Sequence, residues 1–323
     1  MRDAFGRTVD YLRVSLTENC NFRCLYCVPP EGVAFAEEKD LLRADEIVRL
    51  AKIFVHLGIR RVRLTGGEPL LRTDILPLVH ALSLFKGLED VALTTNGSLL
   101  APLARPLKEA GLTTVNVSLD SLDRERFRKI TARDRFDDVF AGLQEALKAS
   151  LRVKINVLAL SDLSREEVLA FCRLALRHPV SIRFLEFMPL CGDGWAPEKM
   201  LPISTIRRWV SEVHALRPLP REHHVAETFA ISGGRGTVGF IASLSEPFCD
   251  SCNRLRLTAS GELSLCLFST TRIDLKAFLR SGESDREIRE QIRAGVHEKP
   301  QGRRSLEKIR NPRELPHIRV IGG

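Results

Sequence analysis

Three cysteines stand within eight positions of the chain, in the stretch CNFRCLYC. Cys20, Cys24 and Cys27 follow the spacing C-x3-C-x2-C, and the sequence has no fourth cysteine near them. Structural zinc normally takes four nitrogen or sulfur ligands, whereas three thiolates can hold three irons of a 4Fe-4S cluster and leave the fourth iron open. The spacing therefore favours an iron–sulfur cluster, with a zinc site completed by a distant His or Cys as the alternative.

A second cysteine set lies in the last third of the chain, within CDSCNRLRLTASGELSLC. Its members, at the spacing C-x2-C-x13-C, are Cys249, Cys252 and Cys266. We predict that RLRLTASGELSLCLF forms a β-hairpin that turns at residues 260–262. Pairing residue 257 with residue 265 would place Cys266 opposite Arg256 and return the third thiolate to the other two.

The other two of the eight cysteines stand alone. Cys172 falls in a helix-like run and is expected in the core, and Cys191 lies in a Gly-rich loop. The polar N-terminus lacks the apolar segment of a signal peptide, and no apolar run approaches the ~20 residues that a membrane-spanning helix needs. We therefore predict a cytoplasmic protein with no membrane partner, whose cysteines serve metal binding or catalysis rather than disulfides.

Six strand-like runs alternate with helix-like runs from residue 11 to about residue 190. The strands read YLRVSLT, RRVRLTG, VALTTN, TVNVSLD, RVKINVLAL and SIRFLEFM. Between them, apolar residues recur at three- and four-residue spacing, as in DEIVRLAKIFVHLG, TDILPLVHALSLF and FDDVFAGLQEALKAS. Six such units in a row predict an α/β fold with parallel strands, an incomplete (βα)6 TIM-like barrel.

Several of these strands alternate polar and apolar residues. Strands of an ordinary parallel barrel are buried on both faces and are apolar almost throughout. The polar positions here are Arg13, Ser15, Thr17, Arg61, Arg63, Thr65, Asn116, Ser118, Asp120, Lys154 and Asn156. An interior lined by such side chains is too polar for a packed core. We therefore expect an open barrel that holds a charged ligand.

The pattern changes after residues 217–227, where strand-like runs such as GRGTVGFIASL replace the alternation. We predict a barrel domain over residues 1–220 and a smaller β-containing domain over residues 221–323 that closes the barrel opening. The net charge of +8 favours an anionic partner. A small polyphosphate fits this charge better than nucleic acid, because the chain has no block of consecutive basic residues and only 6% aromatic residues.

The first cysteine set resembles the signature of the radical S-adenosylmethionine superfamily. CNFRCLYC follows the first predicted strand, at the end of a barrel where active sites are built. TGGEPLLR, residues 65–72, follows the second strand and resembles the superfamily's contact to the methionyl amine. Gly66 and Gly67 would let a ligand approach the backbone closely, and Glu68 would offer charge nearby.

The second set narrows the resemblance to the GTP 3′,8-cyclase family of molybdenum cofactor biosynthesis. CDSCNRLRLTASGELSLC and the terminal Ile321-Gly322-Gly323 are similar to that family's second cluster site and its flexible tail. Further similar stretches are RVSLTENCNFRC, RLTGGEPLLR, LTTNG, NVSLDSLD, KITARDRFDDVF, VKINVL and RFLEFMP. The resemblance covers nearly the whole chain.

The resemblance implies two 4Fe-4S clusters, one on each cysteine set, and S-adenosylmethionine as cofactors. Residues implied to contact S-adenosylmethionine are Tyr26, Gly67, Ser118 and Met188. Residues implied to bind GTP are Arg13, Arg63, Thr94, Lys154, Arg254, Leu255 and Arg256. Implied catalytic residues are Arg256, Gly322 and Gly323. The chain has no G-x4-G-K-[ST] loop, so GTP would be held by side chains and by the open iron of the second cluster.

The implied reaction is the radical cyclisation of GTP to (8S)-3′,8-cyclo-7,8-dihydroguanosine 5′-triphosphate. It implies an electron donor as partner and a downstream cyclic pyranopterin synthase in the same pathway, with the chain as a monomer or homodimer. One alternative is a radical S-adenosylmethionine enzyme that modifies a peptide and carries an auxiliary cluster. The other is a zinc module that binds nucleic acid, suggested by the charge and the C-x2-C spacing.

Overall fold

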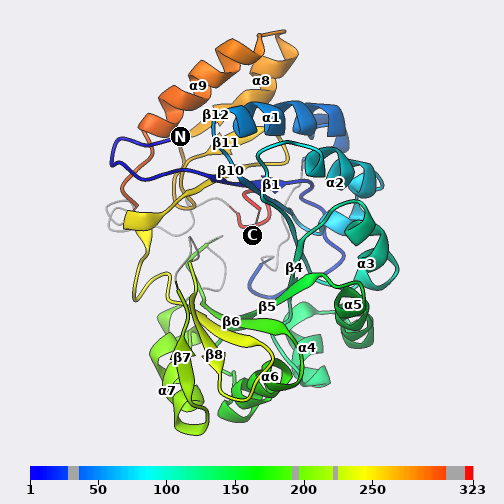
Figure 1. Cartoon of the computed structure of the whole chain (residues 1–323), viewed down its shortest axis with the longest axis vertical. Helices are drawn as coiled ribbons and strands as arrows, with labels where there is room; N and C mark the ends of the chain where they lie inside the picture. The colour runs from blue at the N-terminus through cyan, green and yellow to red at the C-terminus, as the bar shows by residue number, and fades with distance from the viewer. Residues whose placement is uncertain (28–35, 191–195, 221–224, 303–316, 323) are drawn as a thin grey trace.

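The computed structural model describes residues 1–27, 36–190, 196–220, 225–302 and 317–322. Six parallel strands, paired in sequence order, form the barrel wall. They are β1 (Tyr11–Ser15), β2 (Arg61–Thr65), β3 (Asp90–Thr95), β4 (Thr114–Ser118), β5 (Arg152–Ala159) and β6 (Val180–Glu186). Figure 1 shows these strands curving around a central space with the helices outside. The predicted incomplete (βα)6 barrel is confirmed.

Amphipathic helices cover the outer face of the barrel. They are α1 (Ala44–His56), α2 (Ile75–Ser83), α3 (Leu100–Glu109), α4 (Arg124–Thr131), α5 (Phe136–Lys148) and α6 (Arg165–Arg177). Each buries apolar residues at three- and four-residue spacing; α6, for example, buries Val168, Phe171 and Cys172. Cys172 is therefore a core residue, as predicted.

The strands turn their apolar side chains toward the helices. On β5, Val153, Ile155 and Val157 are buried, while Lys154 and Asn156 between them face the barrel interior and stay partly exposed. This alternation follows from the two-residue period of a strand, in which neighbouring side chains point to opposite faces. The core therefore lies between sheet and helices, and the polar face lines the interior.

The C-terminal elements extend the same sheet at both edges. They are α7 (Ile203–Val213), β7 (Leu216–Pro218), β8 (Glu227–Ile231), β9 (Thr237–Ile241), β10 (Arg254–Leu257), β11 (Glu262–Ser264), β12 (Arg272–Asp274), α8 (Leu275–Arg280) and α9 (Asp285–His297). β9 pairs in parallel with β6, and β10 pairs in parallel with β1. The segment between β9 and β10 thus runs from one edge of the barrel to the other, and within the described residues the sheet has twelve strands. The division at residue 220 stays a prediction.

The hairpin forms, but its predicted register is wrong by two residues. Leu257 pairs with Leu263, not with residue 265, and Ser264 lies opposite Arg256 where Cys266 was expected. The turn begins earlier than predicted, because the Thr258 and Gly261 backbones are hydrogen-bonded and Gly261 adopts the left-handed region at φ 88°. The slip is an even number of residues, so the apolar face is kept and Cys266 falls just beyond the end of β11.

Candidate active site

A cavity of about 400 Å³ lies inside the barrel, and both cysteine sets line its wall. Its volume falls in the range of small-molecule sites, which is about 300–1,000 Å³. The lining cysteines are Cys20, Cys24, Cys27, Cys249, Cys252 and Cys266. All six are free thiols. The structure therefore brings together two sets that stand more than 200 positions apart in the sequence.

The first cysteine set sits on the loop that follows β1. The amide of Cys27 donates to the carbonyl of Cys24 (2.9 Å), which closes a turn around Tyr26. The amide of Leu25 donates to the carbonyl of Ile130 (3.0 Å), so the end of α4 holds the loop from outside. Asn96, after β3, points its side-chain amide at the sulfur of Cys20 (3.8 Å).

The loop after β2 fixes the approach to the first set. A side chain on Gly67 would place its Cβ 2.2 Å from the carbonyl oxygen of Asn19, and one on Gly66 would place it 2.4 Å from that of Thr17. The glycines are needed because they pack on the backbone that leads into Cys20, as well as lining the cavity. The expectation that Gly66 and Gly67 let a ligand approach the backbone stays a prediction, and the structure adds this packing role.

Glu68 has a structural environment that differs from the expected one. It is fully buried and accepts hydrogen bonds from the hydroxyl of Thr95 (2.7 Å) and the amides of Leu70 (3.0 Å) and Asn96 (2.7 Å). Burial raises the pKa of its carboxyl to about 7, although these hydrogen bonds lower it. Glu68 therefore braces the ends of β2 and β3 and does not line the cavity.

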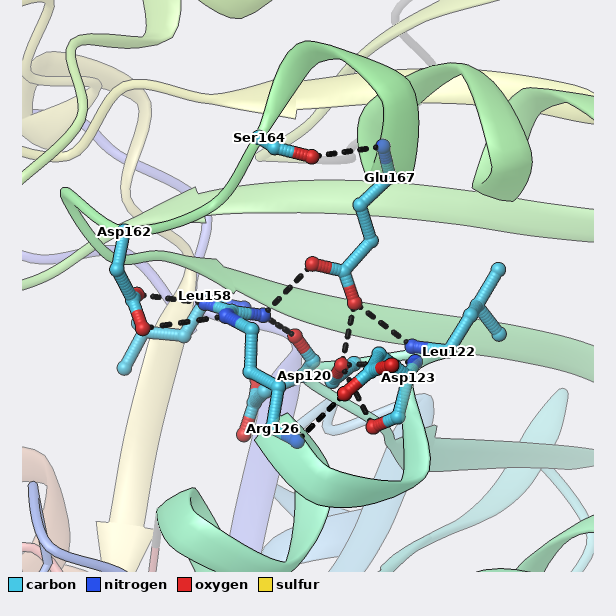
Figure 2. A network of polar contacts seen from close by, with 9 residues as sticks. Asp120, Leu122, Asp123, Arg126, Leu158, Asp162, Ser164 and Glu167 are labelled. Carbon is cyan, nitrogen blue, oxygen red and sulfur yellow. Dashed lines mark hydrogen bonds and ion pairs between the residues drawn. The ribbon is translucent and has the colours of Figure 1, made fainter.

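A network of hydrogen bonds and ion pairs positions Tyr26, which lies between Cys24 and Cys27 of the first set. The hydroxyl of Tyr26 donates to a carboxylate oxygen of Asp120 (2.6 Å), and the other oxygen accepts from the amide of Leu158 (2.8 Å). Figure 2 shows Arg126 between the Asp120 backbone, Asp162 and Glu167. Burial raises the pKa of Asp120, so this carboxyl sits in a region of low solvation.

The second set is built from separate segments. Cys249 begins the short 3-10 helix η4 (Cys249–Ser251), whose last turn brings the amide of Cys252 to the carbonyl of Cys249 (3.1 Å). The carbonyl of Asn253 accepts from the amides that start β1, and Arg7 donates to the carbonyl of Cys249 (2.9 Å). Pairing between β10 and β1 therefore carries this set to the barrel wall.

Thiolates are favoured differently in the two sets. Burial raises the pKa of Cys24 well above its usual value, and the nearby Cys27 raises it further. Burial also acts on Cys252, but the charges of Arg254 and Lys299 outweigh it and lower the pKa of that thiol to about 7. The effect of Arg254 and Lys299 is specific to Cys252, because burial and the neighbouring thiols raise the pKa of Cys249 in the same set.

Arginines line up across three neighbouring strands on the interior face. The sheet register places Arg256 of β10 next to Arg13 of β1, and Arg13 next to Arg63 of β2. Burial lowers the pKa of Arg13 to about 10, and repulsion from Arg63 and Arg254 adds to the effect. Burial lowers the pKa of Arg256 as well. Buried like charges side by side are unfavourable unless an anion lies between them, so this row fits a polyanionic ligand.

The opposite wall presents Lys154 on β5 and Arg183 on β6. Burial lowers the pKa of Lys154 to about 7, helped by Arg183 and Arg63 and opposed by Asp90. Among the described residues, the buried Nε of Arg183 and the buried Oδ1 of Asn116 and of Asn156 have no hydrogen-bond partner. Orphaned polar atoms in a cavity wall are what a polar ligand would satisfy.

The C-terminal tail enters the barrel. The guanidinium of Arg256 donates to the carbonyls of Ile321 (3.2 Å) and Gly322 (2.5 Å), and Figure 1 shows the C terminus in the central space. Gly322 has φ 72°, and a Cβ there would lie 2.7 Å from Thr65. The tail is therefore beside the arginine row. Gly323 and Cys191 lie outside the described residues.

Most residues named from the sequence gather at this cavity. Those that line it are Arg13, Tyr26, Arg63, Gly67, Thr94, Ser118, Met188, Lys154, Arg254 and Arg256. Leu255 does not; its side chain is fully buried in the core between them, so only its backbone could reach a ligand. The ligand contacts of all these residues stay predictions.

The cavity wall also includes residues that the sequence analysis did not name. Arg183 could have been found, because it occupies an alternating polar position in the strand SIRFLEFM. Lys299 and Arg319 had no periodic signal, since they lie outside regular elements after α9.

Known proteins match the chain over almost all of its length. Residues 14–175 match the family described as "Radical SAM superfamily", and residues 180–305 match "Molybdenum Cofactor Synthesis C". A protein of Moorella thermoacetica named GTP 3′,8-cyclase is 42% identical over 98% of this chain and 99% of its own. One of the same name from Heliobacterium modesticaldum is 45% identical over 93% of each chain. The chain therefore belongs to the radical SAM superfamily and, within it, to the family of the GTP 3′,8-cyclases.

Solved structures support the fold. The crystal structure of SuiB from Streptococcus suis aligns with 96% of this chain and 76% of its own, with a TM-score of 0.62 and 16% identity. Another crystal structure of SuiB contains the precursor peptide SuiA. At 16% identity the likeness concerns the fold alone, so it is no evidence that this chain modifies a peptide.

The family's cofactors are two 4Fe-4S clusters and S-adenosylmethionine, and the residues present fit them. Each set offers three free thiols on one cavity, so each would hold three irons of a cluster and leave the fourth without a protein ligand. No group of three Cys, His, Asp or Glu side chains in the described part of the chain is arranged around a single metal ion. The assignment of clusters rests on the family and the thiol sets. In the same part of the chain, no helix is long and apolar enough to span a membrane.

Proposed function

We propose that this chain converts GTP into (8S)-3′,8-cyclo-7,8-dihydroguanosine 5′-triphosphate, an early step of molybdenum cofactor biosynthesis. The observation that carries the proposal is one cavity that both cysteine sets line, together with a row of buried arginines on strands β10, β1 and β2. The relatives named GTP 3′,8-cyclase, similar over 99% and 93% of their length, support the same assignment.

When bound, the first cluster and S-adenosylmethionine supply the radical that removes a hydrogen atom from the ribose of GTP. We assign S-adenosylmethionine to the side of the cavity formed by Tyr26, Gly67, Ser118 and Met188. Tyr26 is held in one orientation by its hydrogen bond to Asp120. These four residues line the cavity and are only partly exposed to solvent, and shielding of this kind protects a reactive intermediate from side reactions.

The triphosphate would lie against the arginine row and Lys154. Guanidinium groups donate paired hydrogen bonds that match phosphate oxygens, and several buried cations would gain a counter-charge on binding. Arg63 is fixed in place by its hydrogen bond to the hydroxyl of Tyr11 and stacks over that ring at 5.8 Å. The protein thus fixes the nucleotide by side chains, with the second cluster's open iron as a further anchor.

The remaining partners follow from the reaction. An electron donor must supply reducing equivalents, and a cyclic pyranopterin synthase would consume the product. We propose a cytoplasmic monomer or homodimer, with residues 1–220 and 221–323 as its two domains. Nucleic acid and membranes are not among the proposed partners.

The test is anaerobic reconstitution with iron and sulfide, followed by incubation with S-adenosylmethionine, GTP and dithionite. We expect 5′-deoxyadenosine and a cyclised nucleotide, separated by chromatography and identified by mass. Arg63→Gln should lower product formation, whereas Arg173→Gln, which changes an exposed arginine of α6, should not. Absence of both products from a protein with full iron content would contradict the proposal.

A further inference from the structure

The chain segment after α9 places a buried cation beside each cysteine set. Lys299 and Arg319 are each only 2% exposed, and both line the cavity. Burying a charged side chain is costly unless a partner compensates for it, so both positions call for an opposite charge nearby.

Lys299 is fixed at the second set. Its ammonium donates to the carbonyl of Arg254 (2.8 Å) and to the carbonyl of Leu265. These two residues lie two positions after Cys252 and directly before Cys266. The ammonium also interacts electrostatically with the thiols of Cys252 and Cys266. An ammonium has three hydrogen-bond donors, so the two backbone contacts fix its position and leave one donor available toward the cysteine sulfurs.

Arg319 is fixed at the first set. Its Nε donates to the sulfur of Cys27 (3.4 Å), and its Nη2 donates to the carbonyl of Phe22 (2.9 Å). The hydroxyl of Ser15 donates to the backbone carbonyl of Arg319 at 3.5 Å, at the end of β1. The tail therefore docks a guanidinium onto the loop that carries Cys20, Cys24 and Cys27.

Both contacts have a consequence for electron uptake. Reducing a cluster adds one negative charge, which a fixed nearby cation stabilises. Hydrogen bonds to the sulfurs and the local charge are among the factors that set the reduction potential of a cluster. Because the cations are buried, water screens them weakly. Their effect should be local to the cysteine set beside which each one lies.

We propose that Arg319 and Lys299 are positioning residues that raise the reduction potentials of the two clusters, Arg319 for the cluster on Cys20, Cys24 and Cys27, and Lys299 for the cluster on Cys249, Cys252 and Cys266. The inference rests on the clusters and not on the nucleotide that the enzyme converts. Docking of the tail would then make the first cluster easier to reduce.

The experiment is a redox titration of the anaerobically reconstituted full chain, followed by electron paramagnetic resonance. Cys20→Ala and Cys249→Ala provide the spectrum of each remaining cluster alone. We expect Arg319→Gln to make reduction of the first cluster at least tenfold less favourable, which is a shift of 59 mV to lower potential for one electron. Lys299→Met should do the same to the second cluster. Each variant should leave the other cluster unchanged.

Two further variants keep the result interpretable. Arg319→Lys retains the charge and should retain more than half of the potential difference. Arg286→Gln removes an exposed charge of α9 and should shift neither cluster. If Lys299→Met loads no iron at all, Arg319→Gln and Arg319→Lys still decide the inference at the first cluster.

Three outcomes would overturn the inference. The first is that neither reduction potential moves in Arg319→Gln and Lys299→Met. The second is that both clusters shift equally in each of these variants and in Arg286→Gln. The third is that the potential of the first cluster shifts as far in Arg319→Lys as in Arg319→Gln. Product analysis with GTP is scored separately. Shifted potentials without any cyclised nucleotide would support this inference and contradict the proposed function. Unshifted potentials with formation of the cyclised nucleotide would support the proposed function and contradict this inference.

Discussion

The two cysteine sets reach the same cavity by different routes. The first occupies one loop after β1, so its three thiols are brought together by eight consecutive positions. The second combines η4 with the end of a hairpin and reaches the barrel only because β10 pairs with β1. Local spacing therefore defines the first set, whereas tertiary pairing defines the second.

Their surroundings differ as well. The first set lies among Tyr26, Asn96 and the glycine loop, with one cation, Arg319, in contact with a sulfur. The second lies among Arg254, Arg256 and Lys299. A cationic setting suits capture of a triphosphate. This difference supports the proposed placement of the triphosphate beside the second set.

Removing one thiol from each set gives the largest contrast. Cys24→Ala should abolish both cleavage of S-adenosylmethionine and cyclisation, because the first cluster loses a ligand. Cys252→Ala should spare binding of S-adenosylmethionine and abolish cyclisation. Product chromatography and equilibrium binding measure the two effects. Full turnover by Cys252→Ala would remove the second cluster from the mechanism.

Glycines that pack on each set offer a steric version of the same contrast. Gly67→Ala would force a Cβ onto the backbone of Asn19, and Gly302→Ala would place one 2.7 Å from the sulfur of Cys249. Overpacking of this kind costs about 1–3 kcal/mol, so each variant should lose stability and iron from its own set. Urea unfolding and iron analysis measure this.

Gly282→Ala is the matched control for Gly302→Ala. Gly282 has a similar positive φ of 83°, and a Cβ there would meet nothing within 4 Å. It should show the backbone cost, about 1–2 kcal/mol, without loss of iron. Equal iron loss in both variants would mean that the contact with Cys249 is unimportant.

Truncating Arg256 tests the substrate side alone. Arg256→Ala should weaken GTP binding about 10- to 100-fold, because a hydrogen bond to a charged group contributes about 1.5–3 kcal/mol and each 1.4 kcal/mol is tenfold. Binding of S-adenosylmethionine should stay within about twofold of the unsubstituted protein. Isothermal titration of each ligand separates the two. An equal loss for both ligands would contradict the division of the cavity.

The pH dependence of GTP binding tests the contribution of Lys154 on the same side of the cavity. With the pKa of Lys154 lowered to about 7, that side chain is mostly neutral above pH 7 in the free protein. A triphosphate favours the charged form, so binding takes up a proton and affinity should weaken as pH rises from 7 to 9, at most tenfold per unit. Lys154→Arg, which stays charged, should flatten this profile.

The same shift has a defined sign for stability. Above pH 7 the unfolded chain binds more protons at Lys154 than the folded one, so the ligand-free protein should gain stability as pH rises toward 10. Arg183, Arg63, Asp90 and Arg152 surround Lys154 and contribute to the shift. The measurement is the urea midpoint of unfolding from pH 7 to pH 10, for the unsubstituted protein and for Lys154→Arg. A midpoint of the unsubstituted protein that falls relative to that of Lys154→Arg would contradict the lowered pKa of Lys154.

The sequence predicted the parts of the molecule that depend on short-range pattern. The period of two in RVKINVLAL identifies the interior position of Lys154, and the spacing in CNFRCLYC identifies the first set. The helix α3 was harder to recognise, because Pro102 and Pro106 interrupt its residue pattern.

Other parts depend on contacts that no local pattern encodes. The predicted hairpin register was wrong because registers that differ by two residues share the same apolar face, so the residue pattern does not distinguish them. The position of the turn, set by Thr258 and Gly261, decides which pairing forms. Extension of both barrel edges by β9 and β10 requires pairings across more than fifty positions. The cations Lys299 and Arg319 lie beside the cysteines but outside helices and strands. Their positions therefore show no helical or strand periodicity in the sequence.

Iron and sulfide content of the anaerobically reconstituted protein tests the central claim most directly. If each cysteine set holds a four-iron cluster, we expect about eight irons per chain, and about four after Cys24→Ala or Cys252→Ala. About four irons in the unsubstituted protein, or zinc in place of iron at either set, would contradict the account of two clusters that share one cavity.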